Sequence, residues 1–241
     1  MKKTLPFLTL WLLGWLLCRP ATMRADVWLV SVGISDYPGV ENDLRLPVKD
    51  AETIAGLYDK NATAHTVLLT DDKATVSAIV NKMNSLYARA KKDDIVVFFF
   101  SGHGSRGAFC AYDGFLDYSR IRDSMAKSRS KNKMIFADAC FSGKMRQAGH
   151  SHKREKLNVM LFLSSRENEY SLDGLRGMKN GVFTSCLLRS LRGGADANGD
   201  RVITARELFD AVSGGVKTLS EGRQHPVMWG NFDHGMPVMK W

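Results

Sequence analysis

The stretch "IVVFFFSGHGSR", residues 95–106, decides the fold of this chain. Its first six residues, Ile95 to Phe100, are all apolar and leave no face for water, which is typical of a strand covered on both sides. Such strands belong to parallel sheets that carry helices on both faces. His103 follows between two glycines, so we expect an imidazole at the carboxyl end of this strand.

Strands and helices alternate on either side of this central strand. Short branched apolar runs predict further strands at 27–34, 65–69, 133–139 and 159–163. Amphipathic patterns predict helices at 47–58, 75–90, 119–127, 184–191 and 205–212. The expected fold class is therefore α/β, with a mostly parallel central sheet between two helical layers. In such sheets the ligand site lies beyond the carboxyl ends of the strands.

The amino terminus has the pattern of a secretory signal. Lys2 and Lys3 precede an apolar run over residues 5–17, which is too short to span a bilayer. We expect cleavage after Ala25, so that residues 1–25 are removed and the protein is secreted or periplasmic. A surface lipoprotein anchored through Cys18 is the less favoured alternative, because a leucine precedes that cysteine where a small residue is expected.

The mature chain is long enough for one sizeable domain, residues 26–241. The formal net charge of the 241-residue chain is +9, and removing the four Lys and Arg residues of the signal leaves +5. This excess favours solubility and loose attraction to acidic surfaces. The densest basic cluster lies within residues 144–156 and has no aromatic residues, so we do not expect nucleic acid as a partner.

Three cysteines remain after the signal, namely Cys110, Cys140 and Cys186. An odd number leaves at least one thiol unpaired, and a Cys110–Cys186 disulfide depends on the geometry of the fold. No spacing of Cys and His resembles that of a zinc site. One thiol is therefore available for chemistry.

Two motifs place reactive side chains at the ends of neighbouring strands. "SGHGS" at 101–105 follows one strand and "ADACFSGK" at 137–144 closes another, so His103 and Cys140 share one edge of the sheet. A catalytic thiol needs a base and donors for an oxyanion. We expect Cys140 to be the nucleophile and His103 the general acid and base. The backbone N–H groups of Gly104 and Cys140 would hold the oxyanion.

Together these motifs resemble those of the caspase-like cysteine peptidases, particularly the metacaspases and their bacterial relatives, in a clan with gingipain- and legumain-type members. The resemblance extends over nearly the whole mature chain: "SGHG" at 101–104, "DACFSG" at 138–143, "VSVGISDYPGVENDLRLPVKDA" at 30–51 and "GVFTSCLLRSLRGGADANGDRVITARELF" at 181–209. It implies a three-layer caspase-like sandwich. It also implies a Cys140–His103 dyad that needs no third member and no cofactor for the chemistry.

The resemblance further implies a preference for Arg or Lys before the cut bond. Metacaspase-like members receive a basic side chain with two aspartates, whose positions match Asp138 and Asp50 here. Electrostatics supports this preference, because two carboxylates at the floor of a pocket attract a guanidinium and repel an acidic side chain. Ser164, directly after strand 159–163, is a further candidate for substrate binding.

Alternatives stay open at this point. Because Asp50 follows Lys49, it could also be an exposed carboxylate on the surface of a helix, with no role in the site. An acid-specific caspase-like peptidase would need arginines in the pocket, and Arg45 and Arg166 do not match that pattern. A non-catalytic binding or scaffold protein could share the fold, since a fold does not establish an activity.

The basic stretch 144–156 cannot belong to a core and predicts an exposed linker. It would divide the domain into a large-subunit-like part, 26–143, and a small-subunit-like part, 157–241. An enzyme that cuts after Arg or Lys would meet its own substrates there, so we expect self-cleavage. The candidate positions are Lys144, Arg146, Lys153, Arg154 and Lys156.

The segment "DANGDRVITARE", residues 196–207, has the ligand spacing of an EF-hand-like calcium loop. The candidate Ca²⁺ ligands are Asp196, Asn198, Asp200, the carbonyl of Val202, Thr204 and Glu207. Arg201 departs from the pattern, because it stands where the loop normally has glycine. The alternative is a turn in which Thr204 and Glu207 form the capping box of the next helix.

Overall fold

The computed structural model describes residues 25–60, 63–105, 107–140, 159–166, 169–172, 174–175 and 177–240. A six-stranded sheet has the order β10-β8-β7-β3-β1-β2. Five strands are parallel to their neighbours: β1 (Val27–Gly33), β2 (Ala64–Thr70), β3 (Ile95–Ser101), β7 (Asn132–Asp138) and β8 (Val159–Leu163). The short β10 (Val227–Trp229) is antiparallel to β8. Every residue of β3 is buried, as its uniformly apolar sequence predicts.

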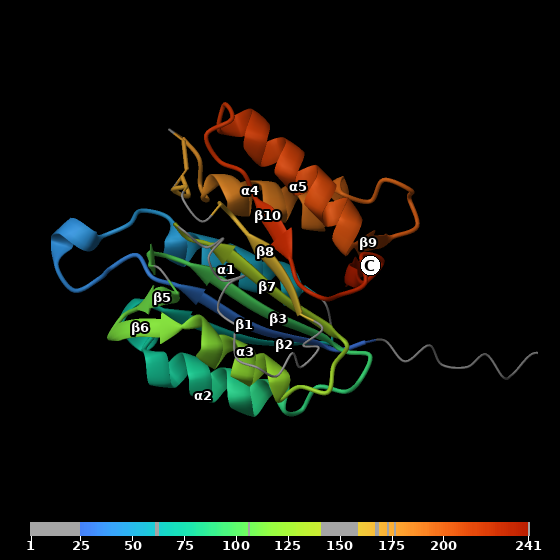
Figure 1. The fold of residues 1–241 in the computed structure, drawn as a ribbon, viewed down its shortest axis with the longest axis horizontal. Coiled ribbons are helices and arrows are strands. Elements are labelled where there is room, and N and C mark those ends of the chain that lie inside the picture. The colour runs from blue at the N-terminus through green and yellow to red at the C-terminus, as the bar shows by residue number, and fades with distance from the viewer. Residues whose placement is uncertain are drawn as a thin grey trace, which may run out of the picture.

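Helices cover both faces of the sheet (Figure 1). The side chains of Val96, Phe98 and Phe100 pack in a core with α2 (Val76–Tyr87) and α3 (Tyr118–Ala126). The alternate residues of β3 pack in a second core with α1 (Pro47–Tyr58), α4 (Val182–Arg189) and α5 (Ala205–Leu219). This three-layer arrangement confirms the α/β fold class.

The predicted strands and helices are all present, with shifted ends. The largest difference is α5, which continues past the predicted Val212 to Leu219. Gly214 and Gly215 interrupt the pattern, but Val216 is fully buried and continues the apolar stripe of the helix. Tertiary packing therefore outweighs the low helix propensity of the two glycines.

Short elements were not predicted. A small antiparallel sheet follows β3 and consists of β4 (Gly104–Ser105), β5 (Ala108–Ala111) and β6 (Gly114–Asp117). A second pair joins β9 (Val202–Thr204) to β11 (Pro237–Lys240). Strands of two to four residues are too short for a sequence period to appear, and only distant pairing defines them.

Some sequence predictions lie outside the described residues. These are the predicted signal up to residue 24, with Cys18, and the predicted linker 144–156 with its five candidate cleavage positions. None of the helices within the described ranges is long and apolar enough to cross a membrane. Cys110, Cys140 and Cys186 are free thiols, and Cys110 and Cys186 pack in cores on opposite faces of the sheet, which excludes a disulfide between them.

Candidate active site

The register of the sheet brings the two reactive motifs together. Ser101 at the end of β3 is the direct partner of Asp138 at the end of β7. His103 and Cys140 each follow two residues later, so they emerge side by side at the same edge. Both line a cavity of about 90 Å³, together with Asp50 and Asp138. Cavities that enclose a whole drug-sized ligand have roughly 300 Å³ or more, so this one suits a single side chain.

His103 is oriented by two contacts from the segment before α1. Its Nε2 lies 2.7 Å from the backbone carbonyl oxygen of Asn42. A carbonyl only accepts hydrogen bonds, so Nε2 carries the proton and Nδ1 of the neutral ring is the proton acceptor. The backbone N–H of His103 donates to the hydroxyl of Tyr37 at 2.9 Å, and that hydroxyl donates to the carbonyl of Cys110 at 3.0 Å. The histidine is thus held on a glycine-flanked turn by neighbouring backbone and by Tyr37.

Cys140 is a protonated thiol in this arrangement. Its Sγ donates to the backbone carbonyl oxygen of Ser171 at 4.0 Å. Burial is the main cause that raises the pKa of Cys140, and the carboxylate of Asp138 raises it further. The negative charge of a thiolate is therefore disfavoured until a base takes the proton.

Gly104 lies directly against the backbone of the nucleophile candidate. A Cβ atom at Gly104 would be 2.1 Å from the carbonyl oxygen of Cys140, so no other residue fits there without a shift of the chain. This close approach brings the Gly104 backbone beside Cys140, where the sequence predicts the oxyanion donors.

Asp50 is buried, with only 1% of its surface exposed, and is not a surface carboxylate. Its Oδ1 accepts from Asn180 Nδ2 at 2.9 Å and from Gly181 N at 3.0 Å, and its Oδ2 accepts from Ser101 Oγ at 2.9 Å. Burial and the nearby charge of Asp138 raise the pKa of Asp50 to about 8. At neutral pH, Asp50 is therefore mostly protonated.

Asp138 is also buried and lies close to Asp50. Its Oδ2 accepts from the N–H of Thr184 at 3.1 Å and from the hydroxyl of Thr184 at 2.8 Å. Its Oδ1 accepts a hydrogen bond from the hydroxyl of Ser171. A Cβ atom at Gly181 would lie 2.6 Å from Asp138 Oδ2 and 3.1 Å from Asp50 Oδ2. The two carboxylates therefore meet across Gly181, the residue that caps the amino end of α4.

Several residues of this site were missed by sequence reasoning. Ser101 stands two residues before His103, and its place in the "SGHG" motif is the one signal that could have revealed it. Ser171 and Gln224 come from irregular segments with no motif. Gln224 is fully buried, and its Nε2 donates to the carbonyl of Ser164 at 2.9 Å and to the hydroxyl of Ser171 at 3.2 Å.

The sequence predicts that Ser164 binds substrate. It is fully buried and does not line the cavity. Its hydroxyl exchanges hydrogen bonds of 3.2 Å with the backbone N–H and carbonyl of Ala139. Ser164 therefore supports the backbone behind Cys140, and its role in substrate binding stays a prediction.

The residues of the 196–207 loop lie together at the start of α5, but they bond within the loop. Asp196 accepts from the backbone N–H groups of Gly199 and Arg201, and Asp200 accepts from Val202 N. Thr204 and Glu207 form the capping box of α5. Arg201 has φ of 65°, the left-handed conformation in which such loops normally place glycine.

The oxygen ligands of this loop suit Ca²⁺ by type. In the part of the chain that the structure describes, no group of three or more His, Cys, Asp or Glu side chains is arranged to hold a metal ion. The calcium site at Asp196, Asn198, Asp200, Val202, Thr204 and Glu207 stays a prediction.

Comparison with known proteins agrees with this geometry. A family model described as the caspase domain, of the C14 peptidases, matches residues 28–233. The fold is similar to the crystal structure of protein GSU0716 from Geobacter sulfurreducens, with a TM-score of 0.66 and 17% sequence identity over 89% of this chain and 97% of that one. Comparison with curated proteins gave no match.

Proposed function

Because the chain belongs to the caspase-domain family of cysteine peptidases, we propose that it is an endopeptidase that hydrolyses peptide bonds after Arg or Lys through Cys140 and His103. The observation that carries this proposal is that two buried carboxyl groups, those of Asp50 and Asp138, line the same cavity as Cys140 and His103.

The proposed chemistry begins with proton transfer from the Cys140 thiol to Nδ1 of His103, while Sγ attacks the carbonyl carbon of the scissile bond. The N–H groups of Gly104 and Cys140 stabilise the oxyanion. His103 then gives its proton to the leaving nitrogen, the C–N bond breaks, and a thioester remains on Cys140. Water attacks the thioester with His103 as base, and the proton returns to Sγ as the carboxyl product leaves.

Ser171 links this chemistry to the specificity pocket. Its carbonyl accepts from the Cys140 thiol and its hydroxyl donates to Asp138. A basic side chain that enters the cavity would form charge-assisted hydrogen bonds with the two carboxylates. No Arg or Lys is among the described residues that line the cavity, which argues against a pocket for acidic side chains.

The test uses matched fluorogenic peptides that end in Arg, Lys or Asp, with the parent protein and its Cys140→Ala variant. We expect turnover of the Arg and Lys peptides, lost in Cys140→Ala and kept in the control Cys110→Ala. Turnover of the Asp peptide alone would replace the proposal with acidic specificity. No turnover of any peptide, with or without calcium, would favour a non-catalytic role.

We also propose that the enzyme cleaves itself after basic residues between 144 and 156. Cleavage there would leave two fragments that remain associated, because β7 and β8 pair in the same sheet on either side of the linker. Incubated parent protein should give two bands on a denaturing gel, while Cys140→Ala stays intact. An intact parent chain after prolonged incubation would contradict self-processing.

Calcium stimulation and export complete the proposal. An Asp200→Ala variant tests the loop. Its activity should respond less to added calcium than the activity of the parent, and an equal response would show that calcium does not act through this loop.

Export is tested by mass spectrometry of protein from the medium or periplasm, which should give a mature chain that begins at Asp26. A chain retained with Met1 would exclude cleavage.

A further inference from the structure

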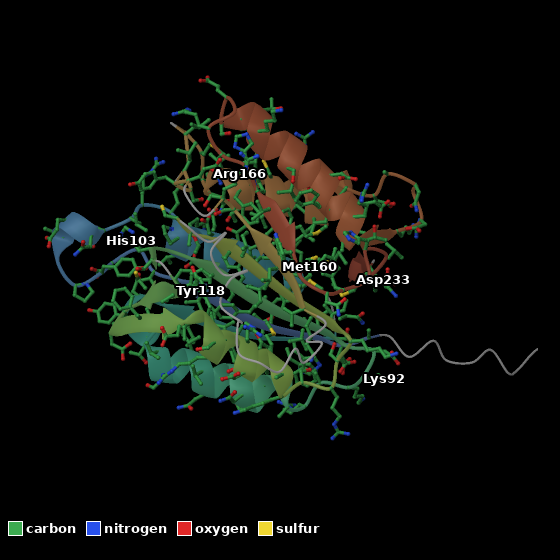
Figure 2. The ribbon with its side chains drawn as sticks, viewed as in Figure 1. Lys92, His103, Tyr118, Met160, Arg166 and Asp233 are labelled. Atoms are coloured by element: carbon green, nitrogen blue, oxygen red, sulfur yellow. The ribbon has the colours of Figure 1, made fainter. Side chains whose placement is uncertain are left out.

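A second concave feature, here called the basic hollow, lies at the amino-terminal edge of the sheet. It has a volume of about 520 Å³ and lies between the end of α2 and the segment that leads into β7. Besides two alanines, all of its lining residues are cationic: Arg89, Lys91, Lys92, Arg129 and Lys131. Figure 2 shows Lys92 at the end of the molecule opposite to His103.

The backbone on one side of the hollow is fixed by inward-facing polar residues. Ser130 is buried, and its Oγ donates to the carbonyl of Asp94 at 2.6 Å. The backbone N–H of Lys131 donates to the carbonyl of Lys92 at 2.9 Å, which joins the two basic segments. Between α3 and β7, Ser128 and Ser130 are buried, whereas Arg129 and Lys131 are exposed.

The hollow carries an excess of positive charge, because its five cations outnumber the adjacent acidic residues Asp93 and Asp94. Within the described ranges, none of its five cations takes part in an ion pair. The buried carboxylate of Asp94 accepts from Trp28 Nε1, Asp26 N and Lys91 N, and its negative charge offsets part of the positive charge. The carboxyl ends of α2 and α3 offset about one unit of charge in total, since each helix end carries about half a negative charge.

We propose that the basic hollow binds a ligand with several phosphate groups. Guanidinium groups bind phosphate oxygens in pairs, and ammonium groups add point charges. Arg89 is already positioned, because its guanidinium lies 4.9 Å from the centre of the Trp28 ring. The described lining holds no aromatic side chain on which a nucleic acid base could stack, which favours a compact phosphate ligand over a single-stranded nucleic acid.

The site is independent of the proposed peptidase chemistry. The catalytic cavity lies at the carboxyl ends of β3 and β7, whereas the hollow adjoins the residues before their amino ends. A ligand in the hollow therefore leaves the entrance to Cys140 free. Where that ligand is a lipid headgroup, it would hold the enzyme at the membrane surface with its cavity pointing away.

The test compares the parent protein with a triple variant, Lys92→Gln, Arg129→Gln and Lys131→Gln. A matched control removes three exposed lysines elsewhere: Lys60→Gln, Lys73→Gln and Lys217→Gln. Calorimetry with sodium tripolyphosphate measures a soluble ligand. Sedimentation with phosphatidylcholine vesicles, with and without phosphatidylglycerol, measures lipid headgroups. Peptide hydrolysis by all three proteins is the check on folding.

We expect the parent and the control to bind at least one of the two probes, and added salt to weaken that binding. The hollow variant should bind about tenfold more weakly, since three exposed charge pairs are lost. Hydrolysis should be equal in the three proteins. Binding to tripolyphosphate alone identifies a soluble ligand, and binding to the anionic vesicles identifies a lipid source. Equal binding by the hollow and control variants, or no binding by the parent to either probe, would overturn the proposal.

Discussion

Asp50 occupies a position that favours its neutral form, although we propose that its pocket receives a cationic side chain. The carboxylate is buried and faces the charge of Asp138, which raises the pKa of Asp50 to about 8. A guanidinium in the cavity would stabilise the ionised form instead. Binding of a basic side chain below this pKa is therefore coupled to release of a proton.

The first prediction concerns the pH dependence of this binding. Agmatine, a small guanidinium compound, should bind the Cys140→Ala variant about tenfold more tightly for each pH unit between 6 and 7.5, with a plateau above 8. Calorimetry in buffers with different ionisation enthalpies should detect the released proton. A neutral urea analogue serves as control, and a pH-independent affinity for agmatine would contradict the coupling.

The second prediction concerns Tyr37, the residue that fixes the backbone of His103. Tyr37→Phe leaves the N–H of His103 and the carbonyl of Cys110 without this partner, at a cost of about 1–3 kcal/mol of unfolding free energy. We expect kcat to fall by about tenfold or more with little change in KM, because the imidazole is misplaced and the pocket is intact. Tyr112→Phe is the control. An unchanged kcat would show that His103 does not depend on Tyr37.

At the scale of elements, the amino end of α4 is the part that assembles the pocket. Gly181 and Thr184 donate backbone hydrogen bonds to Asp50 and Asp138. The partial positive charge of a helix amino end stabilises a carboxylate there. The amino end of α4 thus binds two carboxyl groups that belong to α1 and β7 and are far apart in the chain.

Gly181→Ala tests this arrangement. Gly181 has an ordinary backbone conformation, with φ of −53°, so an added methyl group causes no backbone strain and its only effect is steric. It would lie 2.6 Å from Asp138 Oδ2, and we expect kcat/KM for Arg peptides to fall by about tenfold or more. The control is Gly214→Ala, where the methyl group meets nothing within 4 Å. Equal kinetics in both variants would argue against a pocket at this helix end.

The main elements could be predicted from sequence because each carries its own signal. The run of β3 and the apolar stripes of α1 and α2 identify them without any partner. The strands β4 to β6 carry no such signal, because pairing with each other defines them. The same division holds in the site: His103 and Cys140 stand in motifs, whereas Ser171 and Gln224 depend on long-range contacts. The burial of Ser164 could not be predicted either, because a position at a strand end does not show whether a side chain is exposed.

For the whole molecule, the raised pKa of Asp50 makes stability depend on pH. The unfolded chain loses the Asp50 proton near its ordinary pKa of 3.8, while the folded chain keeps it up to about 8. Between these values the folded state binds more protons, so the contribution of Asp50 to stability falls as the pH rises. Below 3.8 both states are protonated, and that contribution is constant.

The fourth prediction follows from this linkage. Asp50→Asn mimics the neutral carboxyl, so its unfolding free energy relative to the parent should increase between pH 5 and pH 8. The slope should be at most about 1.4 kcal/mol per pH unit. Urea unfolding at several pH values measures it. Asp72→Asn, at an exposed position, is the matched control, and a flat difference for Asp50→Asn would refute the assignment.

Burial raises the pKa of the Cys140 thiol, and this has a consequence for its resistance to oxidation. Peroxides attack thiolates and react slowly with protonated thiols. A nucleophile that keeps its proton until a substrate arrives resists conversion to sulfenic acid. If Cys140 is the nucleophile, as proposed, we therefore expect its sulfur to be oxidised slowly by peroxides while no substrate is bound.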